Sequence, residues 1–77
     1  MMTEHDLQIA LWSAAESGDK QKIRILVVEG ADVFAINPQG LNAIQIAAAH
    51  GHEGAHKTLL AAADMQRLMM AAVKKAA

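Results

Sequence analysis

The chain lacks the residues that usually reinforce a small protein by cross-linking. It has no cysteine, so neither a disulfide nor a thiolate metal site can stabilise it. Its first residues, Met-Met-Thr-Glu-His-Asp, lack the basic start and apolar core of a signal peptide. No apolar run approaches the ~18 residues of a membrane span. The formal net charge of −1 argues against binding nucleic acid through bulk electrostatics. These absences predict a soluble, cytoplasmic protein with no membrane and no nucleic-acid partner.

The chain also has little length from which to build a core. Its 77 residues allow one domain. A chain of this size buries only about 60% of the surface that its unfolded form exposes. Seventeen alanines and only two aromatic residues, Trp12 and Phe34, are typical of closely packed helices. We therefore expect very regular helix packing or oligomerisation to contribute to stability.

Apolar residues at helical spacing predict two helices in the first half of the chain. The first follows a capping Thr3 and ends at Gly18. Its apolar face consists of Leu7, Ala10, Leu11, Ala14 and Ala15. The second begins near Asp19 and ends at Gly30, a residue type that readily adopts the left-handed conformation. Its apolar face consists of Ile23, Leu26 and Val27.

An extended turn and two further helices are predicted in the second half. Apolar and short residues alternate from residue 31, and Asn37-Pro38-Gln39-Gly40 is typical of a β-turn. Asn42 is placed to cap a third helix, with Gln45 as its capping-box partner. We expect the inner face of this helix to consist of Ile44, Ala47 and Ala48. Gly51 ends it, and a fourth helix begins near Glu53.

The two halves share one register. A shift of 33 residues places Leu11 on Ile44 and Gly18 on Gly51. The same shift aligns two further pairs, Ala14-Ala15 with Ala47-Ala48 and Leu26-Val27 with Leu59-Leu60. A 33-residue unit of two short helices and a projecting turn is the signature of the ankyrin repeat.

Over about residues 7–60 the chain resembles the ankyrin repeat family. The resemblance is carried by Gly30-Ala31-Asp32-Val33, Asn37, Gly40, residues 42–48 and Gly51-His52. Asn42-Ala43-Ile44-Gln45 stands in place of the family's helix-opening Thr-Pro-Leu-His, and the first unit is more degenerate. The resemblance implies an all-α fold of stacked helix–turn–helix pairs with a projecting turn. In a single domain over 1–77, the first repeat covers about 7–39 and the second about 40–63.

The repeat pattern then fails, because Ala63 stands where Gly30 ends the second helix of the first unit. Residues 59–73 are almost all strong helix formers. We expect one long final helix over about 53–75, in which residues 64–77 form a helical extension. At 1.5 Å per residue it spans roughly 33 Å. The alternative is a break near Ala63, with Asp64 capping a fifth helix that folds back as a C-terminal cap.

The resemblance implies a protein-binding surface on the turns and the outer ends of the first helices. By position, this surface consists of Pro38, Gln39, Leu41, Ala49 and His50 in the second unit and Glu16 and Ser17 in the first. Phe34 stands where the family usually has an asparagine that ties the turn, so the usual turn hydrogen bonds are not assured. One interpretation makes Phe34 and Leu41 anchors for a partner. The alternative is that Phe34 covers its own core.

Two other apolar residues are expected to pack within the chain. Ile36, two residues after Phe34, is expected to pack against its own turn rather than against a partner. Trp12 replaces the histidine of the family's helix-opening motif. We expect Trp12 to cover the exposed end of the first unit, with a role as a partner anchor as the alternative.

The last helix carries more apolar surface than two repeats can cover. Arrays of this kind usually need about three or more repeats to be stable. One heptad stripe consists of Ala55, Leu59, Ala62, Gln66, Met69 and Val73, and a second apolar line of Met65, Leu68 and Ala72. The residues that we expect to pack against a second copy, in a twofold dimer, are Met65, Leu68, Met69, Met70 and Val73. The alternative is that they fold back onto their own repeats.

No residues form a recognisable catalytic or cofactor-binding set. The two serines, Ser13 and Ser17, lie in the first helix without an evident base. His52 and His56 have a spacing that can hold zinc, but no carboxylate or thiolate completes a clear set. By the 33-residue shift, His56 falls on the core position of Ile23. Either the outer face of the last repeat is open, so that a polar ring is tolerated there, or His56 is half-buried at an interface and makes assembly respond to pH. We expect no metal, no cofactor and no enzymatic activity.

These features predict a module that binds another protein, as an adaptor or a small inhibitor, and that self-associates through its last helix. An oligomeric building block with no separate client is the alternative, and a zinc-dependent enzyme is a third class. The first residues and the lysine-rich end are typical of natural termini, with a piece of a longer repeat array as the alternative.

Overall fold

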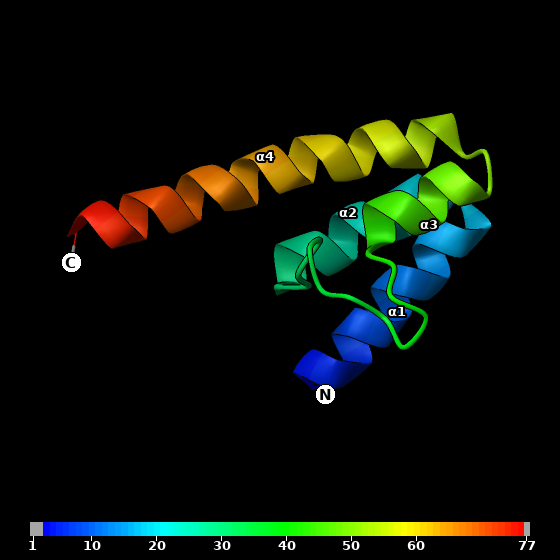
Figure 1. The fold of residues 1–77 in the computed structure, drawn as a ribbon, viewed down its shortest axis with the longest axis horizontal. Coiled ribbons are helices and arrows are strands. Elements are labelled where there is room, and N and C mark those ends of the chain that lie inside the picture. The colour runs from blue at the N-terminus through cyan, green and yellow to red at the C-terminus, as the bar shows by residue number, and fades with distance from the viewer. Residues whose placement is uncertain (1–2, 77) are drawn as a thin grey trace.

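The fold consists of two helical pairs stacked side by side, followed by a long helical extension (Figure 1). The computed structural model describes the backbone of residues 3–76 and the side chains of residues 3–68. Within that part, the first pair is α1 (Glu4–Ser17) and α2 (Lys20–Glu29). The second pair is α3 (Ala43–Ala49) and α4 (Glu53–Ala76). The predicted all-α architecture of helix–turn–helix pairs is confirmed.

The helices begin at residues whose side chains satisfy the first backbone N–H groups. Thr3 forms a capping box with Asp6, and Asn42 forms the predicted one with Gln45. The Asp19 carboxylate accepts a hydrogen bond from the Lys22 N–H at the start of α2. Such caps leave fewer donors without a partner at each helix start.

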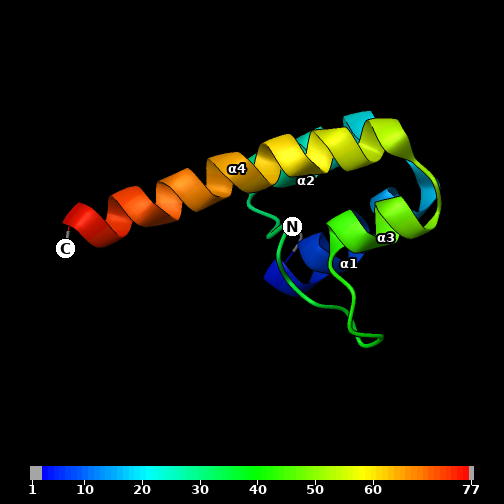
Figure 2. The same cartoon turned by 45° about the horizontal axis from the view of Figure 1, so that its top comes forward.

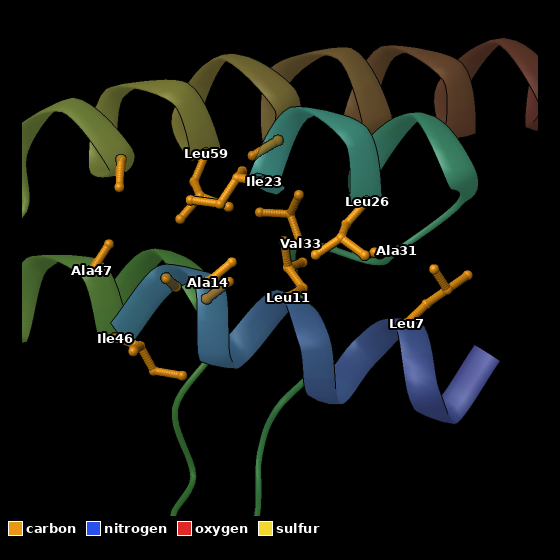
Figure 3. Close-up of a cluster of buried hydrophobic side chains, with 14 residues drawn as sticks. Leu7, Leu11, Ala14, Ile23, Leu26, Ala31, Val33, Ile46, Ala47 and Leu59 are labelled. Carbon is orange, nitrogen blue, oxygen red and sulfur yellow. The ribbon is translucent and has the colours of Figure 1, made fainter. Parts of the chain in front are cut away.

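The core lies between the four helices and is built from small side chains (Figure 3). Its largest fully buried members are Leu11, Ile23, Leu59 and Val33. In Figure 3, Ile23 of α2 and Leu59 of α4 point toward one another across the boundary between the two pairs. The surrounding buried residues include the alanines Ala14, Ala15, Ala43, Ala47, Ala55 and Ala63. Because alanine side chains are short, neighbouring helices approach closely.

The inner face predicted for α3 is wrong at one position. Ala47 is buried and Ile44 is half-buried against the core, as expected, but Ala48 is exposed. Ala43 and Ile46 are buried instead. The reason is that α3 packs on α1 and α4, and among the described residues no further helix covers its other side.

Helix α4 runs without a break from Glu53 to Ala76, so the alternative of a fold-back near Ala63 is wrong. Ala63 is buried in the core within this continuous helix. In both Figure 1 and Figure 2, α4 continues well beyond the end of α2, with no other helix beside its last turns. No described helix, α4 included, is long and apolar enough to cross a membrane.

Candidate functional site

The loop between α2 and α3, residues 31–42, projects from the helices on the side away from α4 (Figure 2). Two glutamine side chains hold its base. The Gln8 amide exchanges two hydrogen bonds with the backbone of Asp32, at 2.8 and 3.1 Å. The Gln66 amide of α4 donates to the Ala31 carbonyl at 2.8 Å and accepts from the Val33 N–H at 3.1 Å. The loop is therefore fixed to both the first and the last helix.

The tip of the loop is the predicted β-turn, and Asn37 organises it. The Gly40 N–H donates to the Asn37 carbonyl at 2.9 Å. The Asn37 side chain also accepts hydrogen bonds from the N–H groups of Gln39 and Leu41, at 3.0 and 2.9 Å. Asn37 therefore ties the turn although Phe34 occupies the position of the family's usual asparagine.

A groove of about 460 Å³ lies between the loop, α1 and α3, and we call it the loop groove. Helix α1 contributes Ile9, Trp12, Ser13 and Glu16; the loop contributes Asn37, Pro38, Gln39 and Leu41; α3 contributes Ile46 and His50. Its lining combines large apolar side chains with a carboxylate, an imidazole and amides. Such a mixture can accept an apolar side chain and hydrogen-bond the groups around it.

Five of the residues predicted for a protein-binding surface line the loop groove: Glu16, Pro38, Gln39, Leu41 and His50. Ala49 and Ser17 are exposed but lie outside it, at the ends of α3 and α1. The Ser17 hydroxyl donates to the Ala14 carbonyl in its own helix. The groove also includes four residues that were not predicted for this surface: Ile9, Ser13, Asn37 and Ile46. The register of α1 and α3 was the available signal for Ile9, Ser13 and Ile46.

Trp12 packs within the chain as predicted, but against the loop. Its indole N–H donates to the Ala35 carbonyl at 3.2 Å, and its ring is half-buried against the core. It also lines the loop groove. Trp12 therefore fixes the position of the loop on α1 and forms part of the groove wall.

Phe34 and Ile36 differ in their environments. Phe34 is half-buried against the core, and the guanidinium carbon of Arg67 lies 5.7 Å from the centre of its ring. Its position beside α4 separates it from the loop groove, whose lining does not include it. Ile36 is 57% exposed, so the prediction that it packs against its own chain is wrong. It lies directly before the turn at the tip of the loop, residues 37–40.

The histidines at the second helical pair make structural hydrogen bonds. His50 Nδ1 lies 3.0 Å from the Ile46 carbonyl oxygen, and His52 Nε2 lies 2.9 Å from the Glu16 carbonyl oxygen. Because a carbonyl oxygen only accepts, each of these nitrogens carries a proton. The two rings stack, with their centres 6.3 Å apart. In the part of the chain that the structure describes, no three His, Asp or Glu side chains are grouped so as to hold a metal ion.

The heptad stripe of α4 faces its own chain over the described residues. Ala55 and Leu59 are buried in the core, and Gln66 binds the loop. The chain's own two repeats therefore cover this side of α4. Met65 and Leu68 are 66% and 71% exposed, which excludes their folding back onto the repeats. The side chains of Met69, Met70, Ala72 and Val73 lie outside the described residues.

A second groove, of about 710 Å³, lies between α2 and α4, and we call it the outer groove. Its lining is largely apolar and includes Val27, Val28, Ala61, Ala62 and Met65. It is bordered by the second helix of each pair, whereas the loop groove is bordered by the first helices.

Comparison with known proteins agrees with this architecture. No curated protein matches the chain. A family profile described as ankyrin repeats (3 copies) matches residues 2–75, nearly the whole chain. Ankyrin repeats are a non-catalytic fold that generally mediates protein–protein interaction. The repeat register, the stacked helical pairs, the projecting loop and this match agree that the chain belongs to the ankyrin repeat family.

Proposed function

We propose that the protein binds another protein in the loop groove and acts as an adaptor or a small inhibitor. The observation that carries the proposal is the gathering of Trp12, Leu41 and His50, from three separate segments, around one groove. A partner then occupies a surface, and no chemical step is needed. The fold supports this role because its loop and first helices form a continuous surface of the kind that repeat proteins use for binding.

The lining of the loop groove indicates the chemistry of the partner segment. Ile9, Trp12 and Leu41 offer apolar surface, and Glu16 and His50 line the same groove with polar groups. A segment with one large apolar side chain, flanked by hydrogen-bonding groups, fits this arrangement. We therefore infer that a short stretch of partner chain inserts an apolar anchor between α1 and the loop.

The proposal is tested with one substitution in the groove and one matched control outside it. Ile9 lines the loop groove and is 48% exposed, whereas Ile25 on α2 is 58% exposed and lies outside the groove. Ile9→Arg places a charge in the groove, and Ile25→Arg makes the same chemical change elsewhere. In quantitative affinity capture from a host extract, a partner retained by the unchanged protein and by Ile25→Arg should be lost with Ile9→Arg.

Circular dichroism must show that both variants keep the helical content of the unchanged protein. Equal retention of the partner by both variants would count against the loop groove. Recovery of only the protein itself, in assemblies of several copies, would favour the alternative of an oligomeric building block without a client.

We also propose that the protein self-associates through α4, and the exposure of Met65 and Leu68 supports this second role. Helix α4 continues beyond these residues to Ala76, and we expect Met69, Met70 and Val73 to extend the same apolar surface. The outer groove beside Met65 is a place where the α4 extension of a second copy can pack. Replacing Met65 and Leu68 by glutamine should lower the mass measured by sedimentation equilibrium, and an unchanged mass would contradict this contact.

A further inference from the structure

The two repeats bury equivalent positions to different extents. In the first repeat, the side that faces the second repeat is buried or half-buried and consists of Leu11, Ala15, Ile23 and Val27. The residues 33 positions later are Ile44, Ala48, His56 and Leu60, and each is more exposed than its equivalent. We call these four residues the end face. They occupy the side of the second repeat on which a following repeat would pack.

The end face is not covered within the described chain. Helix α3 packs on α1 and α4, and α4 packs on α2 and α3. Leu60 is 42% exposed and Ala48 is exposed, while Ile44 and His56 are half-buried. Three of the four residues are apolar, so exposure of this face to water is unfavourable.

The opposite end of the stack does not complement this face. The residues equivalent to the buried Ile46 and Ala55 are Ser13 and Lys22, and both are exposed. A head-to-tail array of copies would place the polar Ser13 and Lys22 side chains where the stack buries Ile46 and Ala55, and burial of polar and charged groups is costly. The end face therefore does not fit the first repeat of another copy.

The charges around Leu60 fit a second end face instead. Glu53 lies seven residues before Leu60 and Arg67 seven residues after it, so all three share one side of α4. Lys57 lies three residues before Leu60 and Asp64 four residues after it, on the same side. All four charged residues are exposed. Positive and negative charges thus alternate about Leu60 along the helix.

A twofold axis that crosses α4 at right angles beside Leu60 would place two α4 helices antiparallel. Glu53 then lies opposite Arg67 of the second copy, and Lys57 lies opposite Asp64 of the second copy. The symmetry repeats each pair, so opposite charges meet on both sides of a central contact between the two Leu60 side chains. A parallel arrangement would place each of these charges opposite its own kind.

We infer that the end face binds the end face of a second copy, with the two α4 helices antiparallel about Leu60. The pair completes the stack in the place of a third repeat. This contact goes beyond the proposed self-association through Met65 and Leu68, because it uses another side of α4. It leaves the loop groove of each copy open to a partner.

The charge arrangement gives a test in which two single variants are compared with the double variant that combines them. In one chain, Lys57 and Asp64 are two helical turns apart and do not touch each other. Lys57→Glu and Asp64→Lys each place like charges opposite one another in the antiparallel pair. Each single variant should raise the dimer Kd by about tenfold, and the double variant should restore it. Sedimentation equilibrium measures the three constants, with the full chain carrying Met65→Gln and Leu68→Gln so that the other proposed contact is removed.

Two further variants complete the design. Leu60→Glu should give a monomer, whereas Ile25→Glu, the same kind of change at an exposed residue of α2 that lies outside both grooves, should leave the dimer intact. A double variant of Lys57 and Asp64 that binds no more tightly than the single variants would overturn the inference. So would a dimer that survives Leu60→Glu. A monomeric Met65→Gln, Leu68→Gln chain would overturn it too, and would assign self-association to Met65 and Leu68 instead.

Discussion

A single glycine at the end of α1 links the two repeats. Gly18 has a φ of 76°, in the left-handed region, and ends the helix. A Cβ atom built on Gly18 would lie 2.7 Å from the ring of His52, which is bonded to the Glu16 carbonyl. The absence of a side chain at Gly18 therefore lets the second repeat approach the end of α1.

Gly51 provides a matched control, because it has a similar φ of 72° and open space around it. Gly51→Ala should cost about 1–2 kcal/mol of unfolding free energy, since alanine is strained in this backbone conformation. Gly18→Ala should cost about 1–3 kcal/mol more, because the added methyl group also displaces the His52 ring. Urea unfolding followed by circular dichroism measures both. Equal losses in the two variants would show that His52 moves aside without cost.

At the scale of elements, the loop depends on two helices that are far apart in sequence. Gln8 of α1 and Gln66 of α4 bind three consecutive residues at its base, residues 31–33. Their surroundings differ: Ala31 and Val33, bound by Gln66, are buried, whereas Asp32, bound by Gln8, is exposed. Water can replace the lost bonds at Asp32 more easily than those at Ala31 and Val33.

Gln66→Ala should therefore destabilise the protein more than Gln8→Ala does. Loss of Gln66 leaves the Val33 N–H and the Ala31 carbonyl without their partner, at a cost of about 1–3 kcal/mol each. Gln8→Ala should cost only about 0.5–1.5 kcal/mol, the net value of ordinary hydrogen bonds. Chemical denaturation of both variants gives the comparison. A larger loss of unfolding free energy for Gln8→Ala would show that the Gln66 hydrogen bonds stabilise the loop less than the Gln8 hydrogen bonds do.

The elements themselves could be predicted because their signals are local. Thr3, Asn42 and Gln45 act within one turn of a helix, and Gly30 stops α2 through its own φ of 114°. The role of Gln66 could not be predicted in this way. Its spacing placed it on an apolar stripe, but spacing does not say whether that stripe meets another chain or the loop of its own.

The candidate groove was predictable in part for the same reason. Pro38, Gln39 and Leu41 belong to a turn whose sequence marks it, and His50 follows the register of the repeat. Ile9 and Ile46 join them only because α1 and α3 lie side by side. Ile36 was misplaced because the direction in which the loop projects depends on its bonds to Trp12, Gln8 and Gln66.

At the scale of the whole molecule, the described core ends well before α4 does. Every buried side chain among the described residues lies at or before Ala63, and the last hydrogen bond to the loop comes from Gln66. Helix α4 nevertheless continues to Ala76. The segment after Leu68 is therefore not needed for the described core, although the proposed contact through Met69, Met70 and Val73 needs it.

Two truncations separate these roles. A chain ending after Leu68 keeps Ala63 and Gln66, so its unfolding free energy should stay within about 1 kcal/mol of that of the full chain. It should also keep the end-face dimer, since Leu60, Lys57 and Asp64 remain.

A chain ending after Ala63 loses both Gln66 hydrogen bonds, so its free energy of unfolding should fall by at least about 2 kcal/mol. The free energy of unfolding expected for a chain of this size is ~4–12 kcal/mol. Thermal unfolding and sedimentation equilibrium of the two chains provide the comparison. If the shorter chain proved as stable as the longer one, the two repeats would support their own loop, and α4 beyond Ala63 would serve only to contact other molecules.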